Sequence, residues 1–128
     1  MHDTIPILPY DPRKNGLRRW FGPLSAAVLD YLWRRNRYTS ARFVHERMEY
    51  QKDIAYTTVL TTLSRLYDDD LIIGRKQLGT AGKAGGAWEY TPRYDRQVWE
   101  QAQYDALIAS IPVAPLIAGG AWGHEGWT

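Results

Sequence analysis

The chain has 128 residues, 45% of them hydrophobic, which allows one packed domain and excludes two domains of ordinary size. The absence of cysteine excludes disulfides, thiolate metal sites and thiol nucleophiles, and it suits a reducing cytoplasm. The net charge of +2 is unevenly spread: residues 1–47 hold nine Lys/Arg and four Asp/Glu (+5), whereas residues 48–128 hold seven and ten (−3).

The first predicted segment is an N-terminal arm, residues 1–22. Prolines at positions 6, 9 and 12 deny it a regular helix. Two pairs of basic residues within positions 13–19 could touch phosphates. Alternatively, Trp20 and Phe21 could hold the arm against the core, and the sequence leaves both readings open.

A first helix is predicted from Pro23 to about Arg35, because proline suits the first turn of a helix. Apolar residues then recur at helical spacing: Leu24, Val28, Leu29 and Leu32. Arginines at positions 34, 35 and 37 complement the C-terminal end of the helix dipole, which gives them a structural role that weakens any functional one.

A second, shorter helix is predicted from Ala41 to about Tyr50, with Thr39 or Ser40 as its N-cap. We expect its inward face and flank to consist of Phe43, Val44, Arg47 and Met48. In helix-turn-helix folds the N-terminus of this helix directs free amides at a DNA phosphate. Ser40 and Arg42 are therefore candidate DNA contacts.

The segment from Ile54 to Tyr67 is predicted to form a third helix with two contrasting faces. One face is apolar (Val59, Leu63 and Leu66), and the other carries Thr57, Thr61, Ser64 and Arg65, with Thr58 on the flank. Threonine disfavours helix formation, so a helix face made of threonines needs an explanation. Either the face has a function, or its threonines are half-buried against the rest of the protein. Its hydroxyls and methyls suit base edges, and arginine suits guanine or phosphate. We interpret this as a recognition helix whose candidate DNA contacts are Tyr56, Thr57, Thr58, Thr61 and Arg65.

Phosphate would repel the acidic run Asp68 to Asp70 that ends this helix, so the run is expected to lie away from DNA. Two short strands follow, at residues 71–77 and 87–91, joined by a flexible loop with four glycines. Leu71, Ile73, Trp88 and Tyr90 alternate with polar or small residues, as in a half-buried hairpin. Three helices and then a hairpin is the winged-helix order, and the candidate contacts of the wing are Arg75, Lys76 and Lys83.

A last helix is predicted from Tyr94 to about Ser110, with a broad apolar surface that suggests a partner chain. The candidate dimerisation residues are Val98, Trp99, Ala102 and Leu107. Residues 112–128 contain four glycines besides Trp122 and Trp127, and are either a floppy end or a segment that docks through its tryptophans.

No catalytic site, metal site or cofactor is predicted, and no small-molecule ligand is expected. The three histidines have no companions at metal-ligand spacing. The stretch Gly79 to Gly86 fails the phosphate-loop pattern, because Ala84 stands where Ser or Thr would hold magnesium. The chain is therefore not expected to be an enzyme. No run of about 18 apolar residues indicates a membrane span, and no export signal is present, so a cytoplasmic protein is expected.

Residues 22–91 resemble the penicillinase-repressor family. The resemblance rests on Gly22–Trp33, Thr39–Glu46 and, most specifically, Ile54–Tyr67, which reads IAYTTVLTTLSRLY. It implies homodimeric winged-helix repressors of palindromic operators, with a recognition helix at about Tyr56–Asp69. The glycine-rich wing loop and the early break at Pro112 depart from the family, and no cysteines or cleavage segment match, so no inducer mechanism carries over.

The sequence therefore predicts an α+β, mainly α, winged helix-turn-helix: three helices plus a β-hairpin wing at residues 23–92. The arm (1–22) precedes it, and the C-terminal helix (93–111) and tail (112–128) follow. The predicted function is sequence-specific transcriptional repression by a homodimer on an inverted repeat in double-stranded DNA. The alternative is a winged-helix protein-interaction module that uses the acidic run and the tryptophan-containing tail.

Overall fold

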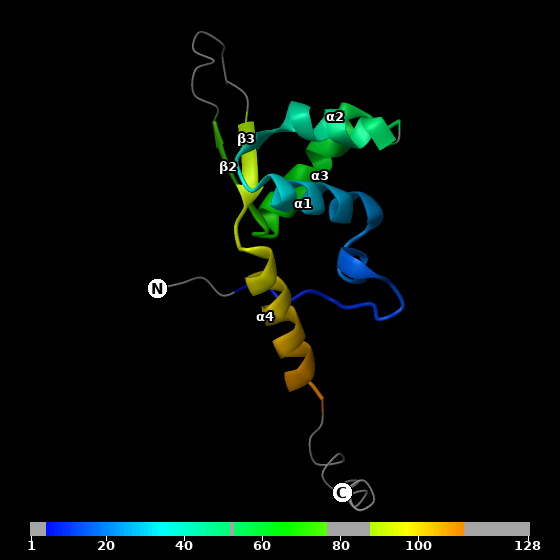
Figure 1. Cartoon of the computed structure of the whole chain (residues 1–128), viewed down its shortest axis with the longest axis vertical. Coiled ribbons are helices and arrows are strands. Elements are labelled where there is room, and N and C mark those ends of the chain that lie inside the picture. The colour runs from blue at the N-terminus through cyan, green and yellow to red at the C-terminus, as the bar shows by residue number, and fades with distance from the viewer. Residues whose placement is uncertain (1–4, 52, 77–87, 112–128) are drawn as a thin grey trace, which may run out of the picture.

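Three helices form the centre of the molecule in the computed structural model, which describes residues 5–51, 53–76 and 88–111 (Figure 1). They are α1 (Pro23–Arg35), α2 (Ala41–Gln51) and α3 (Tyr56–Asp68), close to the predicted bounds. The apolar stripes predicted for α1 and α3 meet in one core, in which Val28, Leu29, Leu32, Val59 and Leu63 are fully buried.

Local sequence explains where these helices begin and end. Pro23 occupies the first turn of α1, and Asn36, which caps the end of α1, has a left-handed backbone with φ of 52°. Asparagine tolerates that conformation better than most residues. At the start of α2 the Ser40 hydroxyl oxygen accepts a hydrogen bond from the Phe43 amide at 3.2 Å, so Ser40 rather than Thr39 is the cap.

A small antiparallel sheet of three strands packs beside the helices. Strand β3 (Trp88–Pro92) lies between β2 (Ile72–Lys76) and β1 (Thr39–Ser40). The hairpin β2–β3 was predicted, whereas β1 was not, because two residues are too few to show a strand period. Three helices followed by this hairpin make an α+β winged helix, as the sequence predicts.

Two predictions about side-chain orientation are wrong. Phe43 was expected on the inward face or flank of α2 but is 54% exposed, whereas Val44 and Met48 of the same helix are buried. Ile73 was expected on the buried face of the hairpin, but it pairs with Thr91, while Ile72 is 1% exposed. Since successive residues of a strand point to opposite faces, Ile72 supplies the core contact of β2.

The N-terminal arm and the last helix pack against each other. The arm contains a 3₁₀ helix, η1 (Gly16–Arg19), and runs beside helix α4 (Arg96–Ala109), which extends away from the winged helix (Figure 1). Trp99 of α4 is fully buried. Its ring stacks on Phe21 at 5.5 Å and meets the edge of Trp20 at 5.1 Å. Of the two readings left open, these contacts favour an arm held against the core.

Polar contacts reinforce this junction. The buried Gln103 side chain accepts a hydrogen bond from the Leu8 amide at 3.0 Å and donates one to the Pro6 carbonyl at 2.7 Å. At the first turn of α4, Arg96 donates to Asp30 of α1 at 2.8 Å. Burial disfavours the charged form of Arg96, but Asp30 and Glu100 outweigh it, and the pKa of Arg96 is raised.

Candidate nucleic-acid interface

Helix α3 presents the polar face that the sequence predicts. Thr57, Thr58, Thr61 and Arg65 are exposed, whereas Val59, Thr62, Leu63 and Leu66 are buried. Within the described residues Arg65 forms no ion pair, so its guanidinium is available to a ligand. The face is therefore rich in hydrogen-bonding groups and carries one uncompensated positive charge.

The threonines of α3 also bond to their own helix. The Thr61 hydroxyl donates to the Thr57 carbonyl, and the buried Thr62 hydroxyl donates to the Thr58 carbonyl, each at 2.9 Å. With its proton engaged, the Thr61 oxygen still accepts hydrogen bonds, and its methyl group remains free. Thr61 in this rotamer is thus suited to the amino groups of adenine or cytosine and to the thymine methyl.

A shallow groove separates α3 from the beginning of α1. Its walls are Gly22, Pro23, Leu24 and Ser25 on one side and Thr58, Thr61, Thr62 and Arg65 on the other. Ser25 was not among the predicted site residues. The sequence offered no signal for it, because a serine in the first turn of a helix is explained by local structure alone.

Tyr56 and Arg42 are brought together by the packing of α2 against α3. Both line one hollow, and the Tyr56 ring, 43% exposed, lies edge-to-face with His45 at 5.4 Å. The Nε2 atom of His45 lies 2.8 Å from the Ile54 carbonyl, which can only accept, so that nitrogen carries the proton. Ser40, in contrast, is half-buried and its oxygen caps α2.

The base of the wing carries Arg75 and Lys76, both exposed at the end of β2. The Arg75 guanidinium donates to Glu89 at 2.9 Å and lies 3.7 Å from the centre of the Tyr38 ring. The sequence did not indicate these two partners, since Glu89 becomes a neighbour only through strand pairing. Lys83, the third predicted wing residue, falls outside the described residues.

The four predicted dimerisation residues do not share one exposed face of α4. Trp99 lies in the core of the single chain, so it has no surface to offer a second copy. Ala102 and Leu107 are half-buried, and Val98 is 53% exposed. The sequence missed Ile108, which is 64% exposed near the end of the helix.

The acidic run Asp68 to Asp70 is exposed at the end of α3, as the alternative function requires, whereas the tryptophans of the tail lie outside the described residues. In the part of the chain that the structure describes, no three His, Asp or Glu side chains are grouped so that they could hold a metal ion. None of the described helices is long and apolar enough to cross a membrane.

Comparison with known proteins places this geometry in a wider context. Residues 21–115 match the family model described as "Penicillinase repressor". Over 95 residues the chain is 44% identical to "Transcriptional regulator BlaI" of Mycobacterium tuberculosis, from strain CDC 1551 / Oshkosh and from strain ATCC 25618 / H37Rv. The alignment covers 74% of this chain but only 58% of each relative, so the chain matches little more than half of their length.

Proposed function

Because this chain belongs to the penicillinase-repressor family, we propose that it is a sequence-specific DNA-binding repressor with α3 as its recognition helix. The observation that carries the proposal is the exposed polar face of α3, with Thr57, Thr58, Thr61 and Arg65 clear of the core. A helix fits the major groove of B-DNA, where threonine and arginine can distinguish base pairs by their edges.

Contacts on either side of α3 would position it on the DNA. Arg42 lies beside Tyr56 at one end of this face, where α2 meets α3, and Ser40 precedes Arg42 at the start of α2. Arg75 and Lys76 extend from the wing. Such contacts go largely to phosphate and sugar, and they fix the register of the protein without carrying sequence information themselves. Lys83 is assigned the same role.

We further propose that the repressor acts as a homodimer on an inverted repeat. Helix α4 supports this, because Val98 and Ile108 leave apolar side chains exposed on a helix that projects from the winged helix (Figure 1). A two-fold dimer would place two recognition helices in successive major grooves, about one helical turn apart. Repression would then be steric, since the bound dimer occupies the DNA that polymerase needs.

The test is selection of bound genomic fragments by the purified protein at a low and a high salt concentration. An inverted-repeat motif that survives high salt is the expected result. Binding that leaves no motif and disappears with salt would contradict specific recognition, because non-specific affinity is almost wholly electrostatic. Retention on heparin gives a quick preliminary measure, and weak retention at low salt would favour a protein-interaction module that uses Asp68–Asp70.

A further inference from the structure

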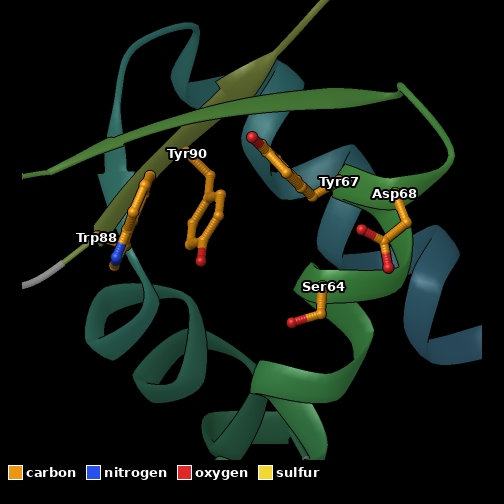
Figure 2. A pocket seen from close by; sticks show the side chains of 5 residues that line it. All are labelled: Ser64, Tyr67, Asp68, Trp88 and Tyr90. Carbon is orange, nitrogen blue, oxygen red and sulfur yellow. The ribbon is translucent and has the colours of Figure 1, made fainter.

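A cleft opens between the last turns of α3 and strand β3, on the side of α3 away from α1. It has a volume of about 270 Å³ and is lined by Ser64, Tyr67, Asp68, Trp88 and Tyr90 (Figure 2). A space of this size accommodates a small molecule rather than a peptide segment. It exists only because folding brings residues 64–68 beside residues 88–90, a proximity that no local sequence pattern indicates.

Aromatic rings form most of the wall of the cleft. Trp88 and Tyr67 remain 42% and 47% exposed, and Tyr90 lies between them, facing the same opening (Figure 2). Isolated aromatic residues on a surface need no explanation, but three that converge on one hollow present several π faces to the same ligand.

The Tyr90 and Trp88 rings pack directly on Gly74 of β2. A Cβ atom at this position would lie 3.1 Å from Cε1 of Tyr90 and 3.3 Å from Cε3 of Trp88. Both distances are shorter than ordinary van der Waals contact. The two rings therefore rest closely on the backbone of the neighbouring strand, and the absence of a side chain at residue 74 fixes the wall of the cleft.

The opposite wall carries a negative charge. The Asp68 side chain faces the rings across the opening, and within the described residues it forms no ion pair (Figure 2). Burial raises the pKa of the Tyr90 phenol, and the nearby Tyr56 and Tyr67 raise it further, so the phenol stays neutral at physiological pH. The charge of the cleft therefore comes from Asp68.

We propose that this cleft is a binding site for a small quaternary or alkylated ammonium compound. The faces of tryptophan and tyrosine attract such cations, and a carboxylate on the facing wall adds charge complementarity. The same carboxylate repels phosphate, so the cleft does not serve as a contact to the DNA backbone. The site goes beyond the proposed function, and its test requires no DNA.

The probe is choline, compared with its neutral isostere 3,3-dimethyl-1-butanol, titrated into the full-length isotope-labelled protein and followed by NMR. We expect the indole Nε1–H resonance of Trp88 to shift with choline, and the isostere to bind at least about tenfold more weakly. Equal affinity for the two compounds would overturn the proposal. So would an unshifted Trp88 resonance at about 50 mM choline.

Variants separate this site from a general electrostatic effect. Asp68→Asn should weaken choline binding about fivefold or more, whereas Asp69→Asn removes the same charge one residue outside the cleft and should leave binding nearly unchanged. Gly74→Ala should also weaken binding, because it displaces the Tyr90 and Trp88 rings. Equal losses in the two aspartate variants, with both folded by circular dichroism, would contradict a specific site.

Discussion

The guanidinium of Arg75 is held between a carboxylate and an aromatic ring. Glu89 accepts a charged hydrogen bond from it at 2.9 Å, and the centre of the Tyr38 ring lies 3.7 Å away. The side chain is nevertheless 55% exposed, whereas that of Glu89 is only 15% exposed. The arginine is therefore held at the base of the wing by two neighbours, and the carboxylate of Glu89 reduces its attraction for a phosphate.

Replacing this carboxylate should strengthen DNA binding. Glu89→Gln keeps a hydrogen-bond acceptor for Arg75 and removes the negative charge. We expect the affinity for all DNA sequences to rise about threefold. The number of counterions released on binding, which sets the salt dependence, should rise by roughly one. Fluorescence anisotropy at several salt concentrations measures both quantities. A gain confined to one operator sequence would contradict a role in phosphate contact.

Arg65 belongs to the proposed base-reading face, so its substitution should act differently. Arg65→Ala is expected to weaken binding to the selected operator by about 1–3 kcal/mol while changing non-specific binding much less. The matched control is Arg34→Ala. Arg34 pairs with Asp30, and Asp30 also bonds to Arg96 of α4, so this arginine belongs to the contact between α1 and α4 and not to the proposed base-reading face. If gel-shift titrations gave unchanged operator affinity for Arg65→Ala, this residue would be removed from the interface.

At this scale the sequence predicts exposure well where a helical period governs it. The exposed threonines of α3 follow directly from the spacing of Val59, Leu63 and Leu66. The prediction fails for Phe43, which is stabilised on the surface by the Arg35 guanidinium, 5.6 Å from the ring centre. Such a cation–π contact depends on the packing of α2 beside α1, and no local pattern encodes it.

Among the elements, the junction of the arm with α4 differs most from what local sequence suggests. The prolines correctly indicated that residues 5–15 form no regular helix. They did not indicate that Gln103 of α4 bonds to the backbone of Pro6 and Leu8. Helices α1 and α2 were predictable because each has a start signal, Pro23 and Ser40, and α3 because of its apolar stripe. A contact between segments this distant in sequence leaves no such trace.

This junction should contribute measurably to stability. Gln103→Ala leaves the Leu8 amide and the Pro6 carbonyl without their partner, and we expect the free energy of unfolding to fall by about 1–3 kcal/mol. Gln101→Ala is the matched control, since Gln101 is exposed on the same helix and its side chain donates to Asp105 of that helix. Urea denaturation measures both. Equal losses in the two variants would indicate a general effect on helix propensity.

The described part of the molecule is elongated, with α4 pointing away from strands β2 and β3 (Figure 1). The resemblance noted for residues 22–91 is confirmed by the family match over residues 21–115, which covers the winged helix and α4. The architecture was therefore predictable. The surface available to a second copy was not, because the arm covers the side of α4 that carries Trp99 and leaves a different side exposed.

If α4 forms the dimer interface, a charge at its exposed end should separate the subunits. Ile108→Glu is expected to convert the dimer to a folded monomer and to weaken operator binding more than tenfold, because the two half-sites are no longer bound together. Sedimentation velocity reports the change in mass. Asn15→Glu adds the same charge on the arm, outside α4, and should leave the mass unchanged. A dimer that Ile108→Glu leaves unaltered would place the interface elsewhere.

The hydrogen bonds of Gln103 also bear on the order in which the chain folds. The bond to Leu8 spans 95 positions of the sequence and the bond to Pro6 spans 97. Most of the polypeptide must therefore be in place before either bond can form. Helices α1 to α3 contact one another over shorter separations and can assemble earlier. We therefore expect the arm to dock onto α4 after the three helices have assembled, and to open without unfolding them. Hydrogen exchange at the Leu8 amide would report that opening while the recognition helix remains intact.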